Sequence, residues 1–427
     1  MISPIDLLIS VPYLPGTGTK VGLCGTIFIL MVQVFLKPGK EIPVLRFHPW
    51  VFSGAIAKIS GQPEDGDLVE VLNKKGDVLG VGHFHHGSIA VRLLSFEKQD
   101  LQEQGYWDQK IQDALKTRSL IAAIQNDQAA FRLVHGEGDG LSGLIIDLYA
   151  GIAVVQCHSI GMHRQINLIS TALQHILGHR LLAVYDKSKE SLPNKYANEQ
   201  SNGYVWKAEN QPIKLPHPVL ENGVRFLVNW ETGQKTGFFL DQRDNRQLLS
   251  RFVADKTVFN GFCYTGGFSC YALKAGAKVV HSVDISSKAM DFCAGNVKLN
   301  EPFSGEHKGL TEDVLKHLNQ SDFQYDVMII DPPAFAKSMD KRHNAVQGYK
   351  RLNLAAMQRV KPGGVMFTFS CSQVVDRELF YHTVAAAAME LGRPVKVLHH
   401  LTQGADHPVS MFHPEGSYLK GLVLQIG

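Results

Sequence analysis

Two short polar clusters carry the residue types best suited to covalent chemistry. Asp331 follows an apolar run and opens the sequence Asp-Pro-Pro-Ala-Phe, and Cys371 follows a second apolar run and lies between two serines. A cysteine thiolate is a strong nucleophile, and a carboxyl group can hydrogen-bond a reacting ring. A free cysteine at the end of a strand is also commonly a small buried residue. The two clusters therefore indicate covalent catalysis without establishing it.

A third cluster indicates a nucleoside site. A short apolar run leads through Asn260 and Gly261 to the pair Gly266 and Gly267, and a helical pattern follows. The next apolar run ends at Asp284, about twenty residues after the turn, where a doubly wound sheet holds an acidic residue against a ribose. The pattern predicts a strand, a glycine turn and a helix.

The glycine spacing bears on the kind of nucleoside. A dinucleotide pocket uses G-x-G-x-x-G to close backbone N–H groups on a pyrophosphate. Gly261 is separated from Gly266 by four residues, which allows close backbone approach without that phosphate cradle. S-adenosylmethionine, with a ribose, an adenine and an amino-acid end but no phosphate, suits such a turn. Glycine turns also serve packing in many α/β proteins, so the turn alone leaves both interpretations open.

All three clusters are expected at one edge of a parallel sheet. Each cluster follows an apolar strand, and open α/β sheets bind ligands outside the carboxyl ends of their strands. One crevice is therefore expected to hold the nucleoside and both reactive side chains.

Longer motifs resemble a known family. The stretches that carry the resemblance are Lys-Thr-Gly-Phe-Phe-Leu-Asp-Gln-Arg-Asp-Asn-Arg at 235–246, Asn-Gly-Phe-Cys-Tyr-Thr-Gly-Gly-Phe at 260–268, 331–335, 349–350, 368–372, 405–408, 414–416 and 418–421. Together they resemble the class I S-adenosylmethionine-dependent methyltransferases that act on cytosine C5 of large-subunit ribosomal RNA. The resemblance extends from about Met31 to Gly427, and the ordered set is far more specific than any single motif.

The resemblance implies an α/β fold of three parts. We place a PUA-like RNA-binding β-barrel at 31–102, a small central α/β domain with a linker at 103–215, and a Rossmann-like methyltransferase domain at 216–427. Strand and turn signals between residues 32 and 96 favour the barrel. Because the family pattern begins at Met31, we interpret residues 1–30 as an extension without a functional role. The apolar run near its end is short for a membrane span, and no membrane association is expected.

The resemblance also implies catalytic roles. Cys371 would add to C6 of cytosine, and Asp331 would hydrogen-bond N3 or the exocyclic amine. The serine-rich turn around Cys371 is expected to lower the pKa of its thiol. Ala334 stands where another subgroup has a second cysteine, so the base that removes the C5 proton is open. Asp406 and His407 are candidates.

Further residues are expected to contact the cofactor or the RNA. The cofactor candidates are Asn260, Tyr264, Thr265, Gly266, Gly267, Asp284, Asp313, Phe239, Asp241 and Arg243. Asp241 is equally interpreted as a helix cap, whereas for Asp313 contact with the adenine amino group is favoured over capping. The substrate candidates are Pro332, Pro333, Phe335, Lys337 and Lys350. Phe335 would stack on a flipped base, and the lysines would contact phosphates unless they are ordinary solvated surface.

Composition limits the class of protein. A chain of 427 residues is too long for one ordinary core, and a net charge of +3 allows RNA binding without predicting it. The six cysteines form no C-x-x-C pair, so neither a disulfide framework nor a zinc ribbon is indicated, and a cytoplasmic location is expected. The nearest approach to a metal cluster, His83-Phe-His85-His86, is interpreted as a solvated hairpin face without a metal ion.

Three functions stay open. The leading hypothesis is a cytosine-C5 methyltransferase acting on large-subunit ribosomal RNA with S-adenosylmethionine as cofactor. Asp-Pro-Pro followed by an aromatic is also typical of RNA methyltransferases that act on exocyclic amines of guanine or adenine, which need no cysteine. The third is a non-catalytic RNA-binding protein that uses its barrel. A homodimer is left open.

Overall fold

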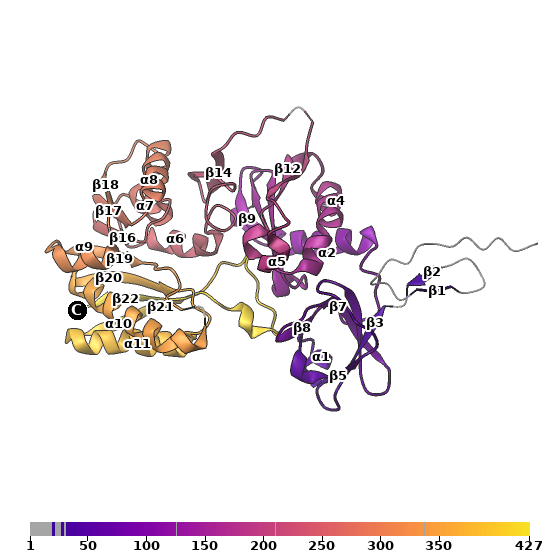
Figure 1. The fold of residues 1–427 in the computed structure, drawn as a ribbon. Helices are drawn as coiled ribbons and strands as arrows, with labels where there is room; N and C mark the ends of the chain where they lie inside the picture. Colours follow the sequence, from indigo (N-terminus) through magenta and orange to yellow (C-terminus); the bar gives the residue numbers. More distant parts are fainter. Residues whose placement is uncertain (1–18, 22–26, 30, 125, 210, 337) are drawn as a thin grey trace, which may run out of the picture. The chain divides into compact units, whose positions relative to one another are not determined.

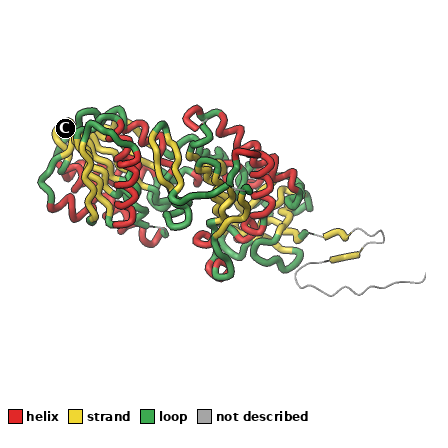
Figure 2. The backbone as a smooth tube through the Cα atoms, turned by 90° about the horizontal axis from the view of Figure 1, so that it is seen from above, coloured by secondary structure: helices red, strands yellow, loops and turns green. Residues whose placement is uncertain are grey.

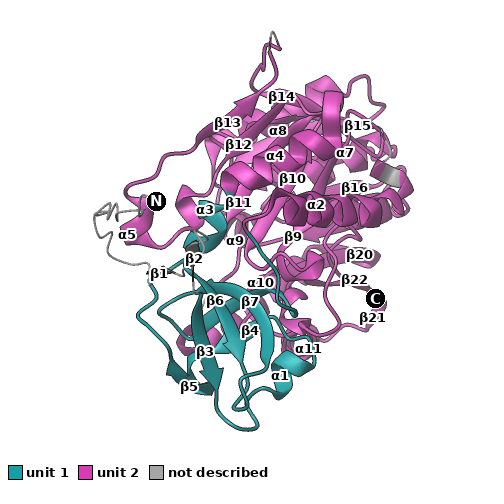
Figure 3. Ribbon diagram, turned by 90° about the vertical axis from the view of Figure 1, so that its right-hand side faces the viewer, with its two compact units in different colours: residues 1–101, 159–165 teal, residues 102–158, 166–427 magenta. Residues whose placement is uncertain are grey.

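The computed structural model describes residues 19–21, 27–29, 31–124, 126–209, 211–336 and 338–427 (Figure 1). The chain divides into two compact units, residues 1–101 with 159–165 and residues 102–158 with 166–427 (Figure 3). The extension expected at 1–30 lies largely outside the described residues. Within it, β1 (Thr19–Val21) pairs antiparallel with β2 (Ile27–Ile29).

The first unit is built on one six-stranded sheet, in the region where the strand and turn signals predict a small β-barrel. The strands pair in the order β4-β8-β7-β6-β3-β5. Their bounds are β3 (Val32–Leu36), β4 (Trp50–Phe52), β5 (Ile56–Ile59), β6 (Leu68–Leu72), β7 (Val78–Phe84) and β8 (Ile89–Ser95), with the helices α1 (Ile42–Leu45) and α3 (Ile160–Arg164). β-Branched side chains such as Val34, Val71 and Val91 form the core because they pack well on a pleated surface.

The interpretation of His83 as part of a solvated hairpin face is wrong. His83 is only 2% exposed. A Cβ atom built on Gly161 of α3 would lie 2.2 Å from Cγ of His83, so the imidazole lies directly against the helix backbone. Burial, together with the charge of Arg164, lowers the pKa of His83 to about 3. The ring is therefore neutral at physiological pH.

The second unit begins with a five-stranded sheet in the order β13-β12-β11-β10-β9. Its strands are β9 (Ala130–His135), β10 (Leu144–Tyr149), β11 (Ile152–Cys157), β12 (Ala183–Asp186) and β13 (Gly203–Lys207). The helices of this region are α2 (Gln104–Ser119), α4 (Ile166–Leu177) and α5 (Asn194–Ala197). Ile169, Ala172 and Leu173 are buried on one face of α4, and this burial explains why apolar residues recur at helical spacing in its sequence.

A hairpin and a larger sheet follow in the same unit. β14 (His217–Glu221) and β15 (Val224–Val228) are antiparallel, and the turn residues Asn222 and Gly223 have φ angles of 48° and 76°. These values fit the turn that an Asn-Gly pair favours, so the predicted hairpin is confirmed.

The larger sheet is the doubly wound sheet expected from the strand ends. Its strands pair in the order β18-β17-β16-β19-β20-β22-β21, and only β22 runs antiparallel to its neighbours. The strands are β16 (Thr257–Gly261), β17 (Val279–Asp284), β18 (Glu306–Thr311), β19 (Tyr325–Ile330), β20 (Val360–Ser370), β21 (Val395–Leu401) and β22 (Lys420–Ile426). The helices are α6 (Arg243–Leu249), α7 (Gly267–Lys274), α8 (Ser287–Leu299), α9 (Val314–Gln320), α10 (Arg342–Gln358) and α11 (Arg377–Leu391). 

Helices cover both faces of this sheet (Figures 1 and 2). Phe268 and Tyr271 of α7 pack on one face, and Tyr349 of α10 and Phe380 of α11 pack on the other. The strand ends between the two helical layers are thereby left free for a ligand. In the part of the chain that the structure describes, no helix is both long enough and apolar enough to cross a membrane.

A buried ionic cluster joins the central sheet to the larger sheet. The carboxylate of Asp406 accepts hydrogen bonds of 3.0 Å from both terminal nitrogens of Arg243 and one of 3.0 Å from the backbone N–H of Arg132 in β9. Arg118 of α2 donates a 2.8 Å hydrogen bond to the backbone carbonyl of Asp406. The side chains of Asp406 and Arg243 are 0% and 1% exposed, so each charge depends on its partners.

Replacement of Asp406 by Asn is expected to destabilise the fold. The change removes the buried counter-charge of the Arg243 guanidinium and leaves it only the half-exposed Asp244 at 3.3 Å, at a cost of about 3–5 kcal/mol in unfolding free energy. Although burial raises it, His407 and Arg243 hold the pKa of Asp406 well below its usual range. This stabilisation is therefore present above the unfolded pKa of about 3.9 and is lost as the pH falls below it.

Urea unfolding at several pH values measures this effect. Asp322→Asn is a matched control, because Asp322 forms only an exposed ion pair with Arg359 at 3.4 Å. Equal stabilities of the two variants at pH 7 would contradict the structural role of the cluster.

Candidate active site

A cavity of about 260 Å³ opens at the carboxyl ends of β16, β17, β19 and β20. Ten of the predicted site residues line it, namely Phe239, Asp241, Tyr264, Thr265, Gly267, Asp284, Asp331, Pro332, Pro333 and Cys371. The three polar clusters singled out in the sequence therefore meet in one crevice, as their positions after parallel strands predict.

The glycine turn brings backbone amides to this cavity. Gly266 has a φ of 80°, and Tyr264 adopts a positive φ of 47°, so the loop between β16 and α7 folds back sharply. The N–H of Tyr264 donates a 2.9 Å hydrogen bond to Oδ2 of Asp284, and the N–H of Ser286 donates one of 2.9 Å to Oδ1. Two amides thus fix the Asp284 carboxylate at the cavity wall.

The polar groups of the cavity suit a ligand with hydroxyls and a positive charge. Among the described residues, Thr265 Oγ1 and Asp241 Oδ1 are buried and have no hydrogen-bond partner in the protein. Asp241, Asp284 and Asp331 supply three carboxyl groups. One of the two cations in the lining, Arg246, is neutralised by a 2.7 Å ion pair with Glu221 outside it. An anionic phosphate is disfavoured here, whereas ribose hydroxyls and a cationic end fit.

Asp331 lies in an environment that favours its protonated form. Burial, and next the charge of Asp241, raise its pKa to about 7. Nε2 of Gln242 donates a 3.0 Å hydrogen bond to Oδ2 of Asp331, and Asn245 in turn holds the Gln242 amide at 2.6 Å. Asp331 can therefore exchange a proton near neutral pH from a fixed position.

The expectation that the serine turn lowers the pKa of Cys371 is wrong. Burial, and next the charge of Asp331, raise the pKa of this thiol. Lys235 and Lys420 act in the opposite direction. The resting thiol is therefore protonated, and its proton must pass to a neighbouring group before the sulfur can attack.

Lys420 is a functional candidate to which the sequence analysis, although it includes the motif at 418–421, assigns no role. It is 4% exposed, and its ammonium donates hydrogen bonds to the backbone carbonyls of Ser372 at 2.5 Å and Tyr418 at 2.9 Å. Burial lowers its pKa to about 8. The antiparallel pairing of β20 with β22 sets Lys420 opposite Ser370, so only a long-range strand pairing reveals its proximity to Cys371.

Four cofactor candidates do not line the cavity, namely Asn260, Arg243, Gly266 and Asp313. Asn260 is buried and donates a 2.8 Å hydrogen bond to Oγ of Ser269. The guanidinium of Arg243 is engaged by Asp406 instead. Gly266 contributes the turn rather than a wall.

The two possible helix caps differ. Asp241 does not cap α6, whose N-cap is Gln242, and its carboxylate instead accepts a 2.7 Å hydrogen bond from the hydroxyl of Tyr418. Asp313 is the N-cap of α9 and accepts a 2.8 Å hydrogen bond from the N–H of Lys316. Capping is thus confirmed for Asp313, which is exposed and does not line the cavity.

The remaining candidates are more dispersed. Phe335 is 36% exposed, and its ring packs against Tyr349 with centroids 4.5 Å apart. Lys350 forms a 2.8 Å ion pair with Glu390. Lys337 lies outside the described residues.

Neither candidate base reaches the cavity. Asp406 and His407 are 0% and 2% exposed and contact each other at 2.9 Å between a carboxylate oxygen and Nδ1. Neither lines the cavity, so the structure does not bring them to Cys371.

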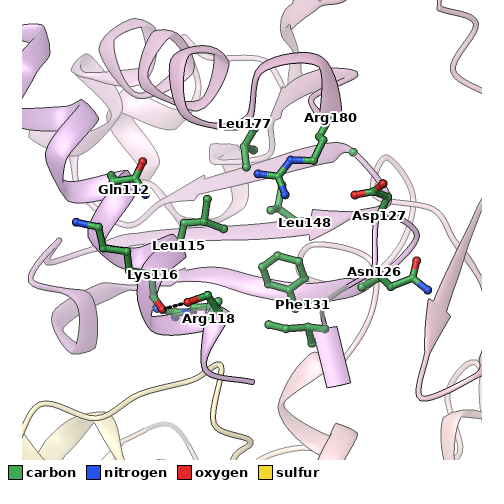
Figure 4. A pocket seen from close by; sticks show the side chains of 14 residues that line it. Gln112, Leu115, Lys116, Arg118, Asn126, Asp127, Phe131, Leu148, Leu177 and Arg180 are labelled. Carbon is green, nitrogen blue, oxygen red and sulfur yellow. Dashed lines mark hydrogen bonds between the residues drawn. The ribbon is translucent and has the colours of Figure 1, made fainter. Parts of the chain in front are cut away.

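A separate hollow of about 460 Å³ lies on the central sheet (Figure 4). Figure 4 shows Phe131 and Leu148 on its floor, with Lys116 and Arg180 at its rim. None of the predicted site residues lines it, and it contains no nucleophile beside a perturbed carboxyl group. The chemistry is therefore assigned to the smaller cavity.

Asp284→Ala is expected to weaken binding of S-adenosylhomocysteine by about 10- to 100-fold, because about 1.5–3 kcal/mol is lost with a hydrogen bond to a charged group. Isothermal titration calorimetry measures the affinity. Asp291→Ala is the control, since Asp291 is exposed on α8. An unchanged affinity in Asp284→Ala would remove Asp284 from the cofactor site.

Known proteins share the sequence and fold of this chain. Residues 131–399 match the S-adenosylmethionine-dependent methyltransferase family, and residues 34–96 match a PUA-like domain. A protein named ribosomal RNA large subunit methyltransferase I from Alteromonas mediterranea is 38% identical over 401 residues, which cover 93% of this chain and 99% of the relative. The protein of the same name from Aeromonas salmonicida is 38% identical over 400 residues, which cover 93% and 100%.

Solved structures show the same fold. A SAM-dependent methyltransferase from Streptococcus mutans gives a TM-score of 0.78 at 22% identity and covers 92% of this chain and 100% of its own. A crystal structure of a methyltransferase complexed with SAH gives 0.79 at 21% identity, with coverage of 92% and 100%. The chain thus combines a PUA-like domain with a Rossmann-like methyltransferase fold and uses S-adenosylmethionine as its cofactor. It belongs to the S-adenosylmethionine-dependent methyltransferase family, together with the relatives named ribosomal RNA large subunit methyltransferase I.

Proposed function

We propose that the protein transfers a methyl group from S-adenosylmethionine to C5 of a cytosine in large-subunit ribosomal RNA, through a covalent adduct with Cys371. The name of the relatives supports the RNA class. The observation that carries the cytosine chemistry is the presence of Cys371 and Asp331 in one cavity, beside the carboxylate of Asp284.

The chemistry of cytosine explains why a thiol is needed. C5 is too weak a nucleophile to accept a methyl group unaided, and addition of the Cys371 sulfur to C6 makes C5 enamine-like. Bound S-adenosylmethionine supplies an electrophilic methyl group. Asp331 donates its proton to N3 and thereby neutralises the charge that addition places on the ring. A water molecule then takes the C5 proton, the C6–S bond breaks to release the Cys371 thiolate, and the N3 proton returns to Asp331, which restores the aromatic ring.

The proton count of the two groups fits this sequence. Near pH 7 the resting pair has two forms, because the pKa of Asp331 is about 7. In one form both Cys371 and Asp331 are protonated, and in the other only the Cys371 thiol is. The attacking state needs one proton in total, on Asp331, with the sulfur ionised. That state arises from the resting pair when the Cys371 proton moves to the Asp331 carboxylate, so no third group is required.

The domains divide the work in this proposal. Residues 31–102 form the RNA-binding PUA-like domain, 103–215 the central domain and linker, and 216–427 the methyltransferase domain. Pro332, Pro333 and Phe335 hold the flipped cytosine, and Lys337 and Lys350 contact phosphates. A cytoplasmic location fits a ribosomal substrate, and a homodimer stays a prediction.

Cys371→Ala is expected to lower methyl transfer by on the order of 10³-fold or more while S-adenosylhomocysteine still binds, because the nucleophile is lost and the cofactor wall is kept. Transfer from labelled cofactor to unmodified total RNA, followed by nucleoside identification, measures the effect and should yield 5-methylcytidine. Cys157→Ala is the control, since Cys157 is buried in the central sheet.

Other outcomes select other functions. Full activity in Cys371→Ala would rule out the covalent route, and N-methylguanosine as product would establish an exocyclic-amine enzyme in which Asp331 acts alone. A wild-type protein that fails to bind S-adenosylhomocysteine would favour a non-catalytic RNA-binding role.

The pH profile is expected to report Asp331. Below its pKa of about 7 the pair holds two protons and is inactive, so kcat/KM should rise about tenfold per pH unit and level off above pH 7. Asp331→Asn should lack this limb and lose about 10²–10⁴-fold in rate. Asp291→Asn, on the surface, should keep it. The same limb in Asp331→Asn would assign the titration to another group.

A further inference from the structure

Two cysteines meet beneath the glycine turn of the cofactor cavity. Cys263 lies in the loop between β16 and α7 and lines the cavity, and Cys293 lies on α8. Cys263, Met290 and Cys293 pack together as one buried cluster. Sγ of Cys263 lies 3.4 Å from Sδ of Met290, and Sγ of Cys293 lies 3.9 Å from Nε2 of His307. Two thiols that are thirty positions apart in the sequence therefore lie together in a mostly apolar, sulfur-rich cluster.

The two sulfurs have the complementary states that oxidation needs. Hydrogen bonding from Cys263, with further help from His307, holds the pKa of Cys293 below its usual range despite burial. The same hydrogen bond and burial raise the pKa of Cys263. A thiolate beside a thiol is the arrangement that reacts with an oxidant and then closes to a disulfide. Burial instead raises the pKa of Cys157 and Cys270, which marks them as inert.

The cluster is reached through the cofactor cavity. Cys293 is 0% exposed, whereas Cys263 is 6% exposed and belongs to the cavity wall. A small oxidant therefore enters beside Cys263 and meets the sulfur of Cys293 directly behind it, so a bound cofactor covers the path to both.

We propose that Cys263 and Cys293 form an oxidation site at which hydrogen peroxide closes a disulfide that impairs cofactor binding. One sulfur attacks the peroxide, the O–O bond breaks, and a sulfenic acid and one water form. The second thiol displaces the sulfenic hydroxyl as a second water, and the S–S bond forms. The two sulfurs lose two electrons to the peroxide, and a thiol reductant reverses the reaction.

A disulfide must move the loop that shapes the cofactor site. A Cβ atom built on Gly266 would lie 2.6 Å from Sγ of Cys293, so the turn already rests on that sulfur without spare space. Drawing Cys263 to bonding distance shifts the adjacent Tyr264, whose N–H positions Asp284. The site is thus linked to cofactor affinity and does not depend on the cytosine chemistry proposed above.

The test uses the full chain carrying Cys371→Ala, so that oxidation of the proposed nucleophile contributes nothing. After hydrogen peroxide and alkylation, non-reducing peptide mapping should find Cys263 linked to Cys293, and calorimetry should show S-adenosylhomocysteine affinity reduced by about tenfold or more. Dithiothreitol should restore the affinity, and S-adenosylhomocysteine added before peroxide should slow the linkage.

Variants separate this site from general oxidation. Adding Cys293→Ala should leave the S-adenosylhomocysteine affinity of the protein unchanged before oxidation and abolish the response of that affinity to peroxide. Adding Cys157→Ala should leave the response intact. A parent protein with no linked peptide after peroxide overturns the proposal, as does an equal loss of affinity with Cys293→Ala present. Should Cys293→Ala fail to fold, the peptide map and the dithiothreitol reversal of the parent decide the question.

Discussion

The ion pair between Asp406 and Arg243 is the interaction on which the arrangement of the second unit depends. Both side chains are almost completely buried, and the same carboxylate accepts a hydrogen bond from the backbone of Arg132 in the central sheet. A charge so placed needs all of its partners at once, so the central sheet, α6 and the loop before β22 adopt one relative position. Because α6 also begins beside Gln242, which hydrogen-bonds Asp331, the cluster helps to fix the position of the proposed proton donor.

The segment from Phe239 to Arg246 therefore serves two ends. Its first residues line the cofactor cavity, and its arginines enter buried ion pairs, Arg243 with Asp406 and Arg246 with Glu221. The sequence motif identifies the whole segment as part of the site, but it does not distinguish a wall residue from a supporting one. That distinction depends on the partners of each arginine, which lie far away in the chain.

Local patterns explain which features the sequence predicts well. An apolar run followed by a polar residue locates Asp284, Asp331 and Cys371, because parallel strands end at one edge of the sheet. This prediction does not require knowing which strands pair. The Asn-Gly hairpin and the cap at Asp313 follow from backbone preferences of the residues themselves. Lys420 is invisible to such reasoning, since its position opposite Ser370 arises from a strand pairing across 50 residues of sequence.

The charges around the cavity explain why its two kinds of thiol behave differently. Burial, and next the carboxyl groups beside it, raise the pKa of Cys371, so this thiol stays protonated and resists oxidation until a positive charge arrives nearby. A cationic ligand in the cavity lowers the pKa of both Cys371 and Asp331, which couples occupation of the site to formation of the nucleophile. Cys293 does not line this acidic wall, and hydrogen bonding from Cys263, with further help from His307, lowers its pKa. In the proposed mechanism the empty cavity therefore keeps the Cys371 sulfur inert, while the proposed oxidation site at Cys263 and Cys293 is then most open to oxidants.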